Sequence, residues 1–150
     1  MKRLRKFRHL TSADRRLLVS TALLLGAIRL GLRLLPFRTM RRVVVRLAQV
    51  PVGSRCTNPS SVDRLVWAVT VASWYVPRAT CLTQALAAQV LLGWHSHQSR
   101  LHVGVARGEE GRLEAHAWVE NQGKVIVGGG ELSRYTLLPD MELENHERCS

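Results

Sequence analysis

The sequence predicts a single α+β domain in which N-terminal helices precede a cysteine-bearing helix that packs on a small antiparallel sheet. Apolar residues recur at helical spacing as far as residue 92, and after a polar loop over residues 94–100 the period changes to two. Turn signals at residues 108–111 and 121–123 then separate three short alternating segments. Helices followed by a meander are typical of α+β domains. A length of 150 residues with 46% hydrophobic composition supports one core and excludes a disordered linker protein.

The charge is divided unevenly along the chain. Residues 1–55 hold fourteen Lys and Arg against one acid, whereas residues 56–150 have a net charge of −2. We therefore divide the chain into a basic helical segment for docking or packing (1–55), a core (56–138) and an acidic tail (139–150). The tail is expected to be loosely held.

Two basic helices are expected in the first segment. One begins with Thr11 as its cap and ends at Pro36, and the other spans about residues 39–50. Three interpretations remain open: apolar faces packed on the core, which we favour, peripheral contact with a membrane surface, or docking of an acidic protein or peptide. Few aromatic residues interleave the basic ones, so no nucleic-acid partner is expected.

No membrane span or signal peptide is predicted. The uncharged run Leu17–Ile28 rises only about 18 Å as a helix, against a hydrocarbon core of about 30 Å. A small-residue cleavage site does not follow it. We expect a cytoplasmic, reducing location in which Cys81 is a free thiol.

Neither a cofactor nor a metal is predicted. The three cysteines form no CxxC motif, and Cys56 and Cys149 are interpreted as a structural thiol and a tail thiol. His95 and His97 lie in a polar loop and would need distant ligands to bind zinc.

The middle of the chain predicts two further helices. Ser60 is expected to cap a helix that ends at Pro77, with Asp63 in its first turn. The next stretch is rich in Ala and Leu and uncharged, which indicates a helix buried on most sides. Thr80 is its expected cap, so Cys81 would be the first helical residue, and Gly93 would end it.

Strands are expected over about residues 101–106, 114–120 and 124–127. In the second strand His116 and Trp118 share one face. If residues 121–123 form a three-residue loop, Glu120 pairs with Lys124 and His116 comes opposite Gly128.

A cysteine at a helix N-terminus and a strand histidine 35 residues later suit nucleophilic catalysis. The free amides and the positive end of the helix dipole stabilise a thiolate and can hold an oxyanion. His116 would accept the thiol proton and later deliver it to the leaving amine. By residue type and spacing alone the pairing is weak, because a cysteine in an Ala-rich helix is usually an inert apolar residue.

Three stretches carry a family resemblance: PRATCLTQALAAQVLL (77–92), LHVGVAR (101–107) and AHAWVENQG (115–123). They resemble the leader peptidases of lasso-peptide biosynthesis, which have a transglutaminase-like, papain-like cysteine-protease core. The likeness covers about residues 60–138. It implies that Cys81 is the nucleophile, His116 the general base and acid, and the leader of a ribosomally made precursor peptide the substrate. A separate lasso cyclase would then close the macrolactam.

The sequence departs from that family in two ways. The family commonly has an acid 12 residues after the histidine, and here that position is Gly128, in a run of three glycines. Glu131, the nearest acid downstream, is our candidate, while Asn121, Glu120, a backbone carbonyl or a Cys–His dyad remain alternatives. The segment 1–55 lacks the strand pattern of a winged helix, which implies the split form with a separate leader-recognition protein.

Two other functions stay open at this point. The same thioester could be resolved by an amine, as in transglutaminase-like amide transfer, or the chain could be a non-catalytic docking module that retains the fold. Three residues have double interpretations: His102 edges the site or packs, Trp118 walls the cleft or packs, and Gln84 assists the oxyanion or packs.

Overall fold

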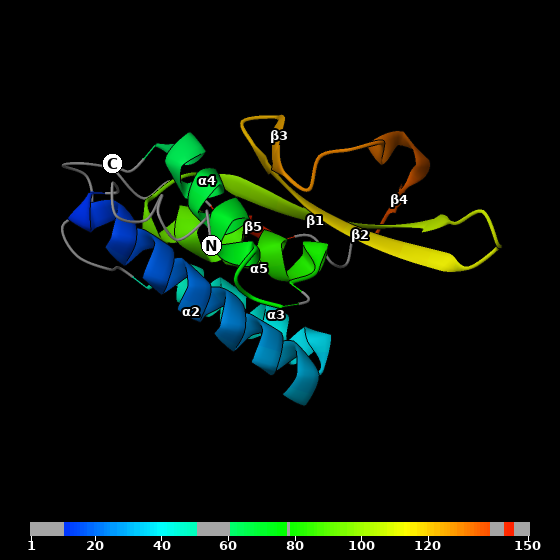
Figure 1. Cartoon of the computed structure of the whole chain (residues 1–150). Coiled ribbons are helices and arrows are strands. Elements are labelled where there is room, and N and C mark those ends of the chain that lie inside the picture. The colour runs from blue at the N-terminus through cyan, green and yellow to red at the C-terminus, as the bar shows by residue number, and fades with distance from the viewer. Residues whose placement is uncertain (1–10, 51–60, 78, 139–142, 146–150) are drawn as a thin grey trace.

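The computed structural model describes residues 11–50, 61–77, 79–138 and 143–145 (Figure 1). It confirms the α+β class, with helices that precede one antiparallel sheet. The helices are α2 (Ser12–Leu34), α3 (Phe37–Gln49), α4 (Val62–Ser73), α5 (Cys81–Trp94) and the short 3₁₀ helix η2 (Leu132–Arg134). The strands are β1 (Ser99–Arg107), β2 (Leu113–Asn121), β3 (Lys124–Val127), β4 (Thr136–Leu137) and β5 (Leu143–Asn145).

Side-chain caps fix where most helices begin. The Thr11 hydroxyl accepts a hydrogen bond from the Asp14 amide at 3.2 Å, as predicted for α2. The cap of α4 is Ser61, one residue later than expected, because its hydroxyl accepts from the Arg64 amide at 3.4 Å. Ser60 lies outside the described residues. Helix α3 begins at Phe37, two residues earlier than expected, directly after Pro36, whose fixed φ suits a helix start.

One buried cluster unites the four α-helices of the described residues with the sheet. Helix α5 lies at its centre, since the side chains from Ala85 to Leu92 are all buried. Helices α2 and α3 contribute Leu25, Ile28 and Val44 to the same cluster. Within the described part of the basic segment, α2 and α3 therefore pack on the core, which is the interpretation that we favoured for these two helices. The predicted boundary between residues 55 and 56 lies outside the described residues and stays a prediction.

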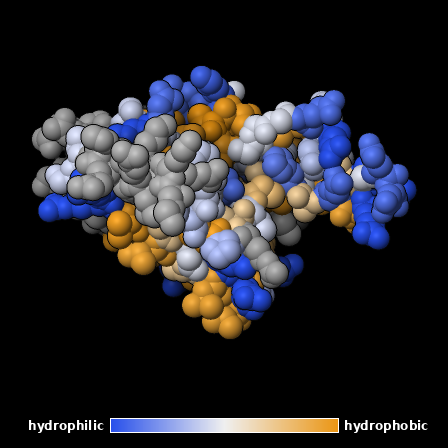
Figure 2. Space-filling view, viewed as in Figure 1, coloured by the Kyte–Doolittle hydropathy of each residue, from blue (hydrophilic) through white to orange (hydrophobic). Residues whose placement is uncertain are grey.

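Helix α2 has 23 residues, and much of its apolar surface is exposed. By length and composition it is able to cross a membrane, and 28% of its most apolar 18-residue window is buried. The uncharged run alone predicted no span, but the helix continues through Arg29 and Arg33. Figure 2 shows hydrophobic side chains along the outer edge of α2. Core helices and signal sequences pass the same length test, so this feature assigns no location.

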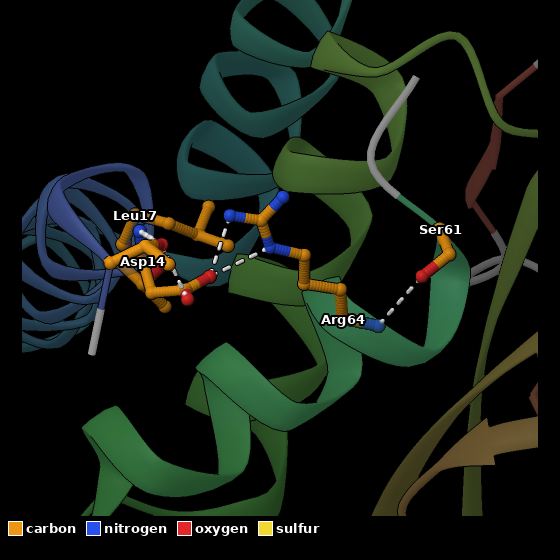
Figure 3. A network of polar contacts seen from close by, with 6 residues as sticks. Asp14, Leu17, Ser61 and Arg64 are labelled. Atoms are coloured by element: carbon orange, nitrogen blue, oxygen red, sulfur yellow. Dashed lines mark hydrogen bonds and ion pairs between the residues drawn. The ribbon is translucent and has the colours of Figure 1, made fainter. Parts of the chain in front are cut away.

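An ion pair joins α2 to α4. Arg64 donates from Nε and Nη2 to one carboxylate oxygen of Asp14, at 2.9 and 2.5 Å (Figure 3). The hydrogen bond from the Thr11 hydroxyl, and then the Arg64 guanidinium, hold the pKa of Asp14 below its ordinary value. The contact links α2 and α4 through residues 50 positions apart in the sequence.

The sheet has the strand order β3-β2-β1-β4, and β5 pairs with the same strand, β1. The main ladder is between β1 and β2, from the pair Arg100 and Glu120 to the pair Arg107 and Leu113. Because β3 and β4 lie at opposite edges, residues 128–135 cross the sheet from one edge to the other (Figure 1).

The acidic tail is not wholly loose. Residues 143–145 form β5, which pairs with Ser99, Arg100 and Leu101 at the start of β1. The expectation of a loosely held tail is wrong for these three residues, because the edge of β1 not used by β2 offers backbone partners. The remaining tail residues lie outside the described part of the chain.

The predicted register between β2 and β3 is also wrong. Gln122 and Gly123 form a two-residue turn with φ of 50° and 78°, and Asn121 rather than Glu120 pairs with Lys124. Such a turn needs positive φ at both positions, which glycine supplies without strain. A bulge follows, since Glu120 faces Val125 while Val119 faces Val127.

Candidate active site

Cys81 is the first residue of α5, as predicted. Its cap is Thr80, whose hydroxyl accepts a hydrogen bond from the Thr83 amide at 3.3 Å. The thiol is free and the residue is partly exposed, whereas Thr83 and most of the helix beyond it are buried. The geometry thus places a sulfur at the open end of a buried helix, where backbone amides without helical partners stabilise negative charge.

Gln84 lies one turn after Cys81, and its side chain contacts the backbone just before the cysteine. Its side-chain amide donates to the Ala79 carbonyl at 3.4 Å. In this arrangement the amide is committed to the backbone, so it fixes the approach to α5 and does not point freely toward an oxyanion.

His116 lies on β2, opposite Gly104 of β1, and is half-buried. Its Nε2 is 2.7 Å from the carbonyl oxygen of Gly128. Because a carbonyl only accepts, Nε2 must carry the hydrogen, and in the neutral ring Nδ1 is then the basic nitrogen. The ring also contacts Tyr135, with centroids 5.2 Å apart, and Trp118 at 6.2 Å.

Gly128, at the position where the resembled family has an acid, reaches the histidine through its backbone. Its φ is +76°, and a Cβ there would collide with the Ala117 carbonyl and lie 3.0 Å from the Trp118 Cα. Glycine allows both this backbone angle and the close approach to β2. Of the orienting groups considered, the one that contacts His116 in the structure is therefore a backbone carbonyl.

The other candidates for an orienting residue lie elsewhere. Glu131 is exposed and directly precedes η2. The side chain of Asn121 donates to the Gln98 carbonyl at 2.5 Å. Glu120 is 3.3 Å from His102 and accepts from the Trp118 indole at 3.4 Å. Glu131 stays a prediction as the third catalytic residue.

The two faces of the β1–β2 ladder have different neighbours. Val103, Ala117 and Val119 belong to the cluster that packs against α5. Side chains alternate along a strand, so His116 and Trp118 lie on the opposite face, where the Trp118 ring stacks on His102 at 5.5 Å. His102 and Trp118 are both buried there, which supports their packing interpretation.

Cys81 and His116 are therefore not joined in this structure. Both residues are described, and no hydrogen bond links the thiol to the imidazole, whose polar contact is with Gly128. Their pairing stays a prediction. Over the described ranges, no three His, Cys, Asp or Glu side chains gather as metal ligands.

Tyr135 is a neighbour of His116 that sequence reasoning missed. It follows the glycine run, and its Cβ lies 2.9 Å from the place where a Cβ on Gly104 would be. No periodicity marks it, because its position depends on the path of residues 128–135 across the sheet.

A family model describes the wider relationship. The model of the Transglutaminase-like superfamily matches residues 22–139. This chain belongs to the transglutaminase-like superfamily. The match begins inside α2 and extends beyond β4, so it includes Cys81, His116, Gly128 and Glu131. Neither a search of curated proteins nor a search of solved structures gave a significant match. Transglutaminase-like proteins are typically cysteine-dependent enzymes, which favours activity of the cysteine-protease or transglutaminase type.

Proposed function

We propose that this protein is a cytoplasmic cysteine endopeptidase that removes the leader from a ribosomally made lasso-peptide precursor. It would act with a separate leader-recognition protein and a lasso cyclase. The observation that carries the proposal is the free thiol of Cys81 at the capped N-terminus of α5, inside the region that matches the transglutaminase-like family.

The reaction would proceed through a thioester. The Cys81 sulfur attacks the carbonyl carbon at the leader–core junction while its proton passes to the imidazole of His116. The C–N bond breaks, the imidazolium protonates the departing amine, and the core peptide leaves with the free amine that ring closure needs. Water then attacks the thioester, which releases the leader as a carboxylic acid and restores the thiol.

The proposal requires the thiol and the imidazole to meet in the substrate complex. Without substrate, catalytic hydrogen bonds are often long or poorly aligned, and they tighten in the reactive complex. The hydrogen bond from His116 Nε2 to Gly128 selects the tautomer whose Nδ1 accepts a proton. Glu131, four residues before Tyr135, would complete the triad if the glycine run carried it to the ring.

Cleavage of the precursor tests the two assigned residues. With the leader-recognition protein present, the wild-type chain should give a separate leader and core by mass spectrometry. Cys81→Ala should abolish both products, and His116→Ala should lower the rate by a factor of about 10² or more, the usual contribution of a general base. Cys149→Ala is the matched control and should cleave normally. A Cys81→Ala chain that still cleaves would remove the assignment.

Glu131→Gln tests the third residue with a smaller change. If Glu131 orients the imidazole, this variant should lower kcat while KM stays unchanged, because orientation acts on the chemical step. An unchanged kcat would leave the Gly128 carbonyl as the orienting group.

Amide transfer at the same thioester gives a different product. Hydrolysis leaves the leader as an acid, whereas an added primary amine would leave it as an amide of distinct mass. We expect the acid even with an amine in excess. Accumulation of the amide would instead identify a transferase.

A non-catalytic docking module is the second candidate. Two observations favour it: Gly128 stands where related peptidases have an acid, and the His116 ring lies on the sheet face opposite to α5. Under this function the Cys81→Ala chain would still support lasso-peptide formation in a reconstituted system that contains another protease.

A further inference from the structure

The outer face of α2 carries a stripe of exposed aliphatic side chains. Val19, Leu23, Leu30 and Leu34 are 60%, 70%, 58% and 72% exposed. Their spacings of four and seven residues place them on one side of the helix, opposite the buried Leu25 and Ile28. This docking stripe, as we call these four residues, extends for about 22 Å along the helix axis. Figure 2 shows hydrophobic side chains along this edge of the molecule.

Arginines border the docking stripe. Residues 11–50 contain eight arginines and a single acid, Asp14, which is paired with Arg64. The exposed arginines are Arg15, Arg16 and Arg33 on α2 and Arg38, Arg42 and Arg46 on α3. Helix α3 packs beside the C-terminal part of the stripe, since Met40 approaches Gly31, which lies between Leu30 and Leu34. The surface is thus apolar at its centre and positive at its borders.

Two aromatic residues extend the N-terminal part of this surface. Tyr75 and Val19 line the same apolar pocket between α2 and the end of α4. Trp74 next to it is exposed despite its size. Tyr and Trp are enriched where one part of a surface meets hydrocarbon and another meets water.

We propose that the docking stripe binds this protein peripherally to an anionic lipid bilayer. Helix α2 would lie parallel to the membrane, with its aliphatic side chains among the acyl chains and the arginines at the phosphate groups. The charge complementarity is direct, because over residues 11–50 the one acid is already paired. This inference is independent of the peptidase proposal.

The shape of the surface favours a bilayer over an acidic protein or a membrane span. Protein partners recognise apolar helices by enclosing them in a groove, whereas this helix forms the outer edge of the molecule (Figure 1). A fluid bilayer needs no complementary shape. A span would expose Leu25 and Ile28, which are buried against the core, and would separate α2 from its neighbours.

Sedimentation with vesicles tests the proposal on the full chain. The protein should bind vesicles of phosphatidylglycerol and phosphatidylcholine, and bind vesicles of phosphatidylcholine alone much more weakly. Leu23→Asn combined with Leu30→Asn should lower the partition coefficient about tenfold or more, because two aliphatic side chains leave the acyl layer. Leu113→Asn, at a residue 76% exposed on β2, is the matched control and should bind as the wild type does.

The charge is tested separately. Each of Arg42→Gln and Arg46→Gln should lower binding to the anionic vesicles about fivefold, since one arginine near such a surface contributes about 1 kcal/mol. The control pair Arg107→Gln and Arg112→Gln removes two exposed arginines at the β1–β2 turn and should have no effect.

Three outcomes would overturn the proposal. Equal binding to neutral and anionic vesicles with resistance to alkaline extraction would indicate a span. A change from dimer to monomer in the Leu23→Asn, Leu30→Asn variant without vesicles would indicate a second copy on the stripe. Unchanged vesicle binding by that variant, with its circular dichroism intact, would exclude the stripe as the contact.

Discussion

At the scale of single residues, Gly128 shapes the surroundings of His116 through its backbone. Its positive φ and missing side chain let the backbone approach β2 closely enough for the carbonyl to bind His116. A carboxylate at this position would have to begin from a Cβ for which there is no space. The group that contacts His116 from this position is therefore a backbone carbonyl.

Gly128→Ala should destabilise the fold and displace the histidine. We expect a loss of about 1 to 3 kcal/mol in the free energy of unfolding from the positive φ, and more from the collision with β2. Gly123→Ala is the control, because Gly123 has φ of +78° but open space around its Cβ position. Urea denaturation gives both losses, and the ring signals of His116 by NMR should move in the Gly128 variant only. Equal losses would show that the collision is relieved at no cost.

Asp14 should make stability depend on pH in the acid range. Its folded pKa lies below the ordinary value of about 3.9, so its contribution is present above that value and is lost as the pH falls through the folded pKa. Asp14→Asn should therefore flatten the acid limb of a plot of urea midpoint against pH. An unchanged limb in the Asp14 variant would contradict this prediction.

At the scale of elements, α4 and α5 begin with similar hydroxyl caps but carry different chemistry. Ser61 caps α4, and Thr80 caps the helix that presents Cys81. Thr80 also lies with its hydroxyl 3.1 Å from that of Thr83, so two side chains fix the first turn. The position of the sulfur thus depends on a local hydrogen bond as well as on packing.

Thr80→Ala should loosen the first turn of α5. The expected cost is about 1 kcal/mol in the free energy of unfolding, the usual value for a lost cap. Hydrogen exchange should become faster at the Thr83 amide and stay unchanged at the Arg64 amide. Ser61→Ala is the reciprocal control: exchange should become faster at the Arg64 amide and stay unchanged at the Thr83 amide. Protection of Thr83 in the Thr80 variant would show that packing alone holds the turn.

The elements that could be predicted from the sequence are those marked by signals between residues close together in the chain. Periodicity and caps are short-range signals, so α2, α5 and the strands β1, β2 and β3 lie close to their predicted bounds, whereas the short strands β4 and β5 were not predicted. The predicted β2–β3 register was wrong by one residue because Gln122 adopts a positive φ. A glutamine in the sequence gives no sign of this backbone conformation. Cys81 and His116 could be chosen as candidates, but the contacts of His116 with Gly128 and Tyr135 depend on a crossing segment that has no sequence period.

At the scale of the whole molecule, α2 and α3 share one interior with α5 and the sheet. Ile28 of α2 and Val44 of α3 lie in the same cluster as Leu86 of α5 and Val119 of β2. Helix α2 thus has one face that stabilises the fold and one that is exposed. Substitutions on the two faces should separate stability from binding.

Ile28→Ala and Leu30→Ala compare the buried and the exposed face of α2 at two positions that lie two residues apart. Ile28 is 1% exposed, so its truncation removes apolar contacts and leaves a cavity, at a cost of about 2 to 5 kcal/mol. Leu30 is 58% exposed, and its truncation should change the free energy of unfolding by no more than about 0.5 kcal/mol. Urea denaturation of the two variants gives both values. Similar losses would mean that the outer face of α2 is also covered in the folded protein, which would remove the basis for a free docking stripe.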